Sequence, residues 1–127
     1  MSANSDTGQG EAAGEYVDLR RITLLESLRS EDQVWTVIAP RYGVTNPDPP
    51  WKVPLYATCE CLSDRGALDS LERRHAEDEL AETVYTEIPN PERQLLALAH
   101  TMLRRGLLSE EDLASRMDLI RSRLHTA

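Results

Sequence analysis

Two adjacent arginines, Arg73 and Arg74, are the residues of this sequence with the clearest capacity for chemistry. A guanidinium group stays positively charged and donates a planar fork of hydrogen bonds, which suits it to bind oxyanions. Neighbouring residues of a helix diverge by about 100°, so we expect at most one of the two to face a given partner. Adjacent arginines more often form a solvated surface, and the residues alone leave both interpretations open.

The cysteines and histidines do not predict a metal site. Cys59 and Cys61 are two residues apart and would point to different faces of a helix, so their thiolates would not converge on one ion. The same spacing is too short for an easy disulfide within the chain. We therefore expect two reduced thiols that pack as small apolar side chains, and no metal or cofactor bound by this chain.

Other familiar catalytic patterns are missing. No serine stands in a Gly-x-Ser-x-Gly turn, and the sequence has no glycine-rich phosphate loop. His100 lies beside the apolar positions of a predicted helix, where a lone histidine is more often a hydrogen-bonded packing residue than a catalyst. Hydrolytic catalysis by this chain alone is therefore unsupported.

Length and charge restrict the class of protein further. With 127 residues the chain has room for one domain, and its 40% hydrophobic content without phenylalanine predicts a small core. A net charge of −8 disfavours binding to nucleic acid or to anionic membranes. The sequence has no secretory signal and no apolar run of membrane-spanning length, so we expect a cytoplasmic protein.

The first 54 residues are expected to form a tail, a helix and an extended arm. Residues 1–15 are rich in Gly, Ser, Ala and acids and predict a disordered tail. Residues 16–54 predict a helix of about three turns with Asp18 as N-cap, followed by an extended arm that wraps a surface. Five of the seven prolines fall in residues 40–54, and proline resists helix continuation. Residues 33–40 suit either an extended piece or more helix.

Residues 55–127 predict a small helical domain. A first helix over 55–64 ends at Gly66, and Asp69 starts a second that runs to about Ala81. Pro91 starts a third helix, whose apolar face carries Leu95, Ala99 and Met102, with Leu96 and Leu103 beside them. Gly106 ends it, and Ser109 caps a fourth helix with Leu113, Met117, Ile120 and Leu124 in one stripe. The expected fold is mostly α: an extended Pro-rich N-terminal arm, then a helical domain ending in an αα-hairpin.

Residues 55–124 also resemble a known family, the N-terminal helical domain of nitrile hydratase β subunits. The resemblance is strongest to its free-standing version, the β subunit of the three-subunit thiocyanate hydrolase. The matching residues are Tyr56-Ala57-Thr58-Cys59-Glu60-Cys61-Leu62, Arg65-Gly66, Glu72-Arg73-Arg74, Thr83-Val84-Tyr85, Pro89, Glu92-Arg93 and Gly106-Leu107-Leu108.

The resemblance implies a role for the arginine pair. In that family a non-corrin cobalt(III) or iron(III) ion is held by a partner, the α-type subunit, through cysteines of which two are oxidised. Arginines of the β side hydrogen-bond the oxidised cysteine oxygens, and the β side also walls the substrate channel. Carried onto this sequence, Arg74 best fits that spacing and Arg73 is its neighbour, while Tyr85 and Asn90 are the channel candidates.

Two departures from the family refine these expectations. Nitrile hydratases read Pro-Tyr-Tyr-Glu-Arg where this chain has Pro89-Asn90-Pro91-Glu92-Arg93. The smaller Asn90 would leave more room at the channel mouth and suggests a bulkier nitrile, such as a heterocyclic one. The β-barrel domain of ordinary β subunits is also absent from this sequence, which implies a third, barrel-type subunit.

Four interpretations of the function remain open at this level. The first is a subunit of a multi-subunit nitrile hydratase, a lyase that hydrates nitriles to amides, in which this chain is not catalytic alone. An alternative is the β subunit of thiocyanate hydrolase. A metallochaperone that activates the metal-binding subunit is a further alternative, and an unrelated helical interaction module is the fourth and weakest interpretation.

Overall fold

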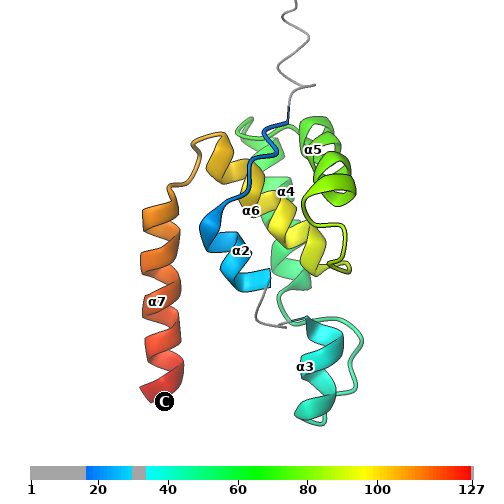
Figure 1. Ribbon diagram of the computed structural model, residues 1–127, viewed down its shortest axis with the longest axis vertical. Coiled ribbons are helices and arrows are strands. Elements are labelled where there is room, and N and C mark those ends of the chain that lie inside the picture. The colour runs from blue at the N-terminus through cyan, green and yellow to red at the C-terminus, as the bar shows by residue number, and fades with distance from the viewer. Residues whose placement is uncertain (1–16, 30–33, 127) are drawn as a thin grey trace, which may run out of the picture.

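The structure is a computed structural model that describes residues 17–29 and 34–126. Within these residues it contains helices and no strands, as the sequence predicts (Figure 1). The helices are α2 (Thr23–Arg29), α3 (Trp35–Arg41), α4 (Lys52–Asp64), α5 (Ser70–Thr83), α6 (Glu92–Arg104) and α7 (Glu110–Thr126). The predicted disordered tail, residues 1–15, lies outside the described residues. In the described part of the chain no helix has both the length and the apolar character needed to cross a membrane.

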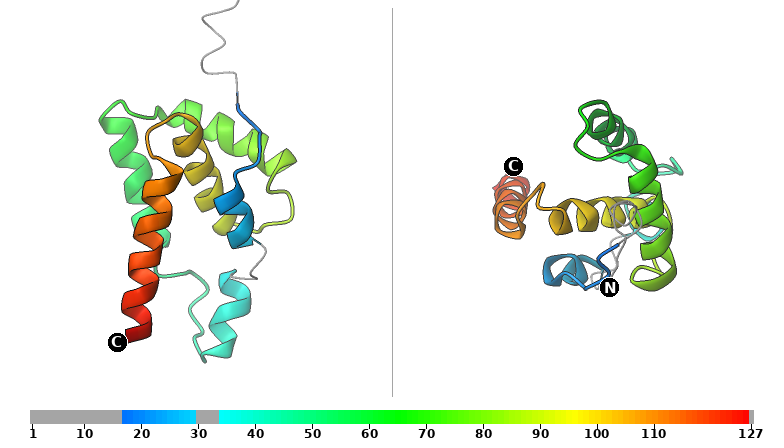
Figure 2. Two further views of the ribbon diagram at one scale, coloured as in Figure 1. Left: turned by 60° about the vertical axis from the view of Figure 1, so that its left-hand side comes forward. Right: turned by 90° about the horizontal axis from the view of Figure 1, so that it is seen from above.

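Helix α6 is the centre of the packing, with other helices around it (Figure 2). One of its sides contributes Leu96 and Ala97 to a cluster formed with α2, α5 and the turn after α5. The other side contributes Leu98 to a second cluster with α4 and the α4–α5 corner. The buried members of the first cluster are Ile22, Leu25, Leu80, Val84, Tyr85, Ile88, Leu96 and Ala97, and those of the second are Leu55, Cys59, Leu68 and Leu98.

Because α6 is buried on two sides, the predicted single apolar face was partly wrong. Leu95, expected on that face, is 40% exposed. Ala99 packs against the first cluster and Met102 against the second, so the two helix sides share the predicted positions. A helix that packs on two sides needs apolar residues around much of its circumference. A single apolar stripe covers only one side of such a helix.

The chain uses the same corner between α4 and α5 and between α6 and α7. Each corner reads Arg-Gly-x-Leu followed by an N-cap residue, and the glycines Gly66 and Gly106 have φ of 75° and 76°. Ala67 N donates to Leu62 O and Leu107 N donates to Met102 O, both at 2.9 Å, so each corner closes with the bonds of a Schellman-type helix end.

The predicted caps after these corners are confirmed. The Asp69 carboxylate accepts hydrogen bonds from Leu71 N at 3.0 Å and Glu72 N at 3.4 Å, and α5 begins directly after it. Ser109 Oγ accepts from Asp112 N at 3.0 Å at the start of α7. Each bond satisfies a backbone donor that has no partner inside its helix.

The first segment differs from its prediction. Residues 17–22 form an extended strap instead of helix, and α2 begins only at Thr23. Asp18 does not cap that helix. Its carboxylate accepts from the backbone N of Arg20 at 3.1 Å and from the Arg20 side chain, a local turn that competes with helix formation.

The proline-rich arm is also shorter than predicted. Residues 35–41 are helical as α3, with Pro40 inside the helix, so the non-helical part spans only residues 42–51. The Trp35 indole Nε1 donates to Asn46 O at 2.8 Å and folds the arm back on α3. Trp35 N donates to Glu92 Oε2 at 2.5 Å, which joins the start of α3 to the start of α6. Pro54 lies in the first turn of α4, where a missing N–H costs little.

Candidate functional site

The candidate site is the charged run Glu72–Arg74 in the first half of α5. Successive residues of a helix are about 100° apart, so these three side chains leave α5 in different directions. The Asp69 cap fixes where the helix begins and therefore which direction each side chain takes.

Glu72 faces α6. Its carboxylate forms an ion pair with the guanidinium of Arg105, the C-cap residue directly after α6. The pair joins the first turn of α5 to the α6–α7 corner and so holds the charged run against the core.

Arg73 is engaged within its own helix. Its Nη1 lies 2.8 Å from Glu77 Oε2, one helical turn on, and the two side chains are only 19% and 18% exposed. Burial raises the pKa of Glu77, and the charge of Arg73 opposes that rise. Arg73 Nε is enclosed without a hydrogen-bond partner in the described structure. Arg73 therefore stabilises the α5 surface next to α4.

Cys59 lies close to this ion pair. It is buried at 8% exposure and packs in the second core cluster, as predicted for a small apolar side chain. Burial raises the pKa of its thiol, and the nearby Arg73 charge acts in the opposite direction. Cys61 differs from the prediction because it is exposed, although both cysteines are free as expected.

Arg74 points away from these contacts. It is exposed, and its guanidinium forms no hydrogen bond or ion pair with the residues that the structure describes. Its charge lowers the pKa of Glu77 only as the weakest of several influences. Of the two adjacent arginines, Arg74 is thus the one whose donors are open to another molecule.

The two channel candidates lie at the other end of α5. Tyr85 is completely buried, and its hydroxyl lies 2.9 Å from Nδ1 of His100. Asn90 is exposed, directly before Pro91 at the start of α6. From Arg74 to Thr83, the last residue of α5, the helix rises about 14 Å. The structure therefore does not bring the arginines, Tyr85 and Asn90 together in one pocket of this chain.

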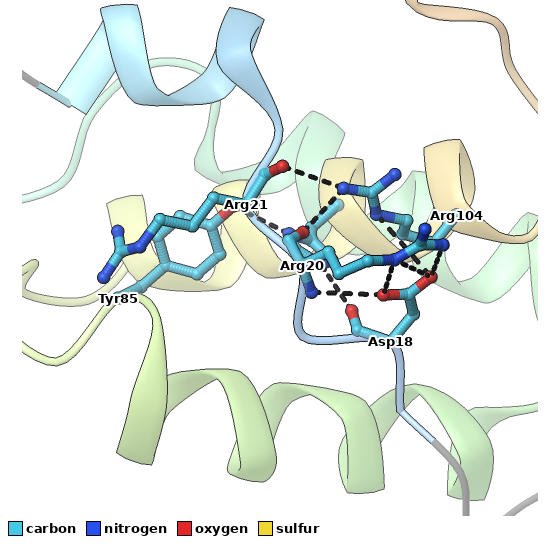
Figure 3. A network of polar contacts seen from close by, with 6 residues as sticks. Asp18, Arg20, Arg21, Tyr85 and Arg104 are labelled. Atoms are coloured by element: carbon cyan, nitrogen blue, oxygen red, sulfur yellow. Dashed lines mark hydrogen bonds and ion pairs between the residues drawn. The ribbon is translucent and has the colours of Figure 1, made fainter.

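A small cavity lies on another side of α5, against α6. Its volume is about 140 Å³, and it is lined by Val17, Asp18, Glu72, Ala76, His100, Thr101, Arg104 and Arg105. Arg104 reaches across to the strap, and its Nη2 donates to Arg20 O at 2.7 Å and to Arg21 O at 2.8 Å (Figure 3). Arg104 Nε stands 3.9 Å from the Asp18 carboxylate.

His100 completes this network. It is 1% exposed, and its Nε2 lies 2.7 Å from the backbone oxygen of Asp18. A carbonyl oxygen only accepts, so Nε2 carries the proton and Nδ1 accepts from the Tyr85 hydroxyl. The prediction of a hydrogen-bonded packing histidine is confirmed. Burial lowers the pKa of His100, and the hydrogen bond from Arg20 holds the pKa of Asp18 well below its usual range.

Sequence reasoning missed Asp18 and Arg104 as partners. They are 86 positions apart, and the local pattern around Asp18 favours a helix N-cap, whereas Arg104 looks like an ordinary surface charge. The cue in the sequence is weak: a lone histidine and an arginine at i and i+4 of the same helix, His100 and Arg104, both of which hold the strap.

These observations define what the chain offers chemically. The described residues contain no group of three or more His, Cys, Asp or Glu side chains placed to hold a metal ion. Both nitrogens of His100 are occupied by structural hydrogen bonds. The exposed guanidinium of Arg74, on a capped and packed helix, is available for contact with an anion on another molecule.

Comparison with known proteins gives the same family as the sequence motifs. Residues 35–126 match the family described as nitrile hydratase beta subunit, N-terminal. The thiocyanate hydrolase subunit beta of Thiobacillus thioparus is 31% identical over 75 residues, which are 58% of this chain and 48% of that protein. The match thus spans about half the length of this curated relative. No solved structure matches the chain. The matched family covers most of the chain, from α3 to α7, and the chain therefore belongs to the nitrile hydratase beta subunit N-terminal family.

Proposed function

We propose that this chain is the non-metal-binding subunit of a multi-subunit nitrile hydratase, the lyase that hydrates nitriles to amides. Membership in the family supports a subunit role. The observation that carries the proposal further is the contrast between the two arginines of α5: Arg73 is paired with Glu77, whereas Arg74 is exposed. In this proposal the chain docks against an α-type subunit that holds the cobalt or iron, and a third, barrel-type subunit completes the enzyme.

Arg74 is the residue proposed to act at the partner's site. Its guanidinium would donate hydrogen bonds to the oxidised cysteine oxygens that surround the metal, and these anionic acceptors suit a bidentate donor. The metal, when bound in the partner, supplies the Lewis acidity that activates the nitrile. Arg73 would contribute indirectly, because its ion pair with Glu77 fixes the surface of α5 from which Arg74 projects.

Asn90 is the residue of this chain proposed to line the substrate channel. Its exposed side chain can offer an amide donor and acceptor to a substrate that passes. Tyr85 is buried behind that surface, so we assign it the role of holding the turn between α5 and α6 through His100. A small polar residue at the mouth favours a bulky, polar nitrile such as a heterocyclic one.

The relative from Thiobacillus thioparus favours a second candidate, the β subunit of a thiocyanate hydrolase. Both candidates use the same arginine chemistry and differ in substrate. The deciding experiment is coexpression of this chain with a cysteine-cluster subunit and a barrel-type subunit, which should be sought in the neighbouring reading frames. Purified complexes are then assayed with aliphatic nitriles, heterocyclic nitriles and thiocyanate.

The expected result is a stoichiometric complex that produces an amide from a nitrile. Activity should vanish when either this chain or the metal-binding subunit is omitted. Turnover of thiocyanate without nitrile hydration would support the second candidate. A chain that leaves once the metal subunit has matured, with full activity in its absence, would overturn both and identify a metallochaperone.

A further inference from the structure

The strap and α5 meet across the small cavity described above. Val17 and Asp18 of the strap line one part of it, and Glu72 and Ala76 of α5 line another. Arg104, from α6, also lines the cavity and binds the strap directly through two backbone carbonyls. The strap is thus hydrogen-bonded directly to α6, whereas at Val17 and Asp18 it faces α5 across the cavity.

The wall of this cavity contains a donor that needs an acceptor. Arg104 Nε is enclosed and has no hydrogen-bond partner among the residues that the structure describes. It stands 3.9 Å from the Asp18 carboxylate, which is too long for a hydrogen bond (Figure 3). Because Asp18 also lines the cavity, this N–H lies on the cavity side of the guanidinium. Two polar groups at such a separation can be joined by a water molecule between them.

Other polar groups of the wall can complete the hydrogen bonds of such a water. The hydroxyl of Thr101 donates to a backbone carbonyl of α6 at 2.8 Å, so its oxygen remains an acceptor. The Glu72 carboxylate has more lone pairs than its ion pair with Arg105 uses. A water that accepts from Arg104 Nε therefore finds acceptors in the wall, directly or through a second water.

The size and charge of the cavity suit water better than an ion. Its volume of about 140 Å³ has room for a small cluster, because one molecule takes up about 30 Å³ in liquid water. The two carboxylates of the wall would repel an anion. Both are already paired with arginines, which disfavours a cation. Cavities that stay dry have apolar walls, whereas this wall contains a donor and acceptors.

We propose that this cavity is a hydration site, in which ordered water accepts from Arg104 Nε and connects the strap to α5. The water satisfies an enclosed donor that would otherwise cost stability. The strap then has two kinds of attachment, direct hydrogen bonds to α6 and water-mediated hydrogen bonds to α5. The inference does not depend on the proposed enzymatic role.

NOESY and ROESY spectra of the isotope-labelled full chain, recorded at low temperature where exchange is slow, test the proposal. Water held in the cavity should give the Nε–H of Arg104 a cross-peak to water whose sign differs between the two experiments. Proton exchange with solvent, or water that passes quickly, gives the same sign in both. The exposed Nε–H of Arg74 is the control and should show this second pattern. The same pattern at both arginines, whichever it is, would overturn the proposal.

Two substitutions of Ala76 test the site through stability. Ala76→Val fills the cavity with methyl groups, whereas Ala76→Ser leaves most of the space and adds a hydroxyl, and the two new residues have similar helix propensities. Displaced water leaves Arg104 Nε without its acceptor. Ala76→Val should therefore lose the water cross-peak and unfold at a lower urea concentration than Ala76→Ser.

In a dry cavity the added methyl groups would instead gain contacts and stabilise the chain. Ala76→Val that is as stable as Ala76→Ser, or more stable, would thus refute the hydration site. If Ala76→Val does not fold, the wild-type spectra decide the question.

Discussion

The hydroxyl of Tyr85 donates to Nδ1 of His100 at 2.9 Å, and the two rings meet edge to face with centroids 5.7 Å apart. The other imidazole nitrogen donates to the backbone oxygen of Asp18 at 2.7 Å. One buried histidine thus connects the end of α5, the middle of α6 and the N-terminal strap, and in the neutral imidazole Nδ1 is the acceptor and Nε2 the donor.

Removal of the Tyr85 hydroxyl tests this link. Tyr85→Phe keeps the ring but leaves Nδ1 of a buried imidazole without its donor, and we expect a loss of about 1–3 kcal/mol in the free energy of unfolding. Urea unfolding followed by circular dichroism measures it. Tyr56→Phe is the control, because Tyr56 is 44% exposed and its 3.4 Å contact with Gln94 is weak. Equal effects of the two variants would contradict the link.

His100 should also make stability depend on pH. Its pKa is lowered in the folded chain, so between that value and the usual 6.5 the unfolded state binds a proton that the folded state does not. The free energy of unfolding should therefore fall as pH decreases from about 7 towards 5. Unfolding in urea across this range measures the slope. In His100→Gln the slope should flatten, and an unchanged slope would assign it to other groups. Asp18, whose pKa is also lowered, adds a further loss only below about pH 4.

Arg104 should control the strap. Arg104→Ala removes two hydrogen bonds to the carbonyls of Arg20 and Arg21, and we expect about 1–3 kcal/mol lower stability, concentrated in residues 17–22. Hydrogen–deuterium exchange should show faster exchange at Ile22 and the following turn of α2, with little change in α4. Arg105→Ala, whose ion pair holds α5 instead, is the neighbouring control. The same exchange pattern in both variants would refute a specific role for Arg104.

Substitutions of the two adjacent arginines of α5 should have different effects, on activity for Arg74 and on stability for Arg73. In the assembled complex, Arg74→Lys should leave assembly intact and reduce activity about 10²–10³-fold, because an ammonium group cannot reproduce the bidentate fork. Arg73→Lys should retain most activity and instead lower the stability of this chain, since its partner Glu77 is within α5. Activity assays on complexes of verified stoichiometry measure the first effect, and urea unfolding measures the second. Full activity in both variants would remove the arginines from the mechanism.

The two thiols should react differently. Cys61 is exposed, whereas Cys59 is buried and its pKa is raised by burial. Titration of the native isolated chain with a thiol reagent should modify one cysteine rapidly, and two after unfolding in urea. Cys61→Ser should abolish the rapid phase, and Cys59→Ser should leave it unchanged. Rapid modification of both cysteines in the native chain would contradict the packing of Cys59.

Local sequence signals predicted the second half of the chain well. Gly66 and Gly106 mark helix ends because the left-handed φ that they adopt is costly for other residues. Asp69 and Ser109 mark helix starts because their side chains accept from the first free backbone donors. These effects act within four residues, which is the range that a sequence pattern can report.

Structural features that depend on contacts between residues far apart in the sequence were not predictable. The strap is extended because its carbonyls bind His100 and Arg104, about 80 positions away. Helix α3 includes Pro40 although proline resists helix, and its first residue is held by Glu92. The exposed state of Arg74 and the paired state of Arg73 depend on how α5 is rotated against α4, which a helical pattern with few apolar residues does not specify.

The repeated corner has a consequence for association. The α4–α5 corner is held by packing of Leu68, which is 1% exposed, whereas Leu108 at the α6–α7 corner is only half-buried. Both corners nevertheless keep the same glycine conformation and the same backbone hydrogen bonds. The direction of α7 is therefore encoded locally, in the turn that precedes it. Any molecule that binds α7 meets a helix that is already preorganised, and association then costs less conformational entropy than the ordering of a free segment would.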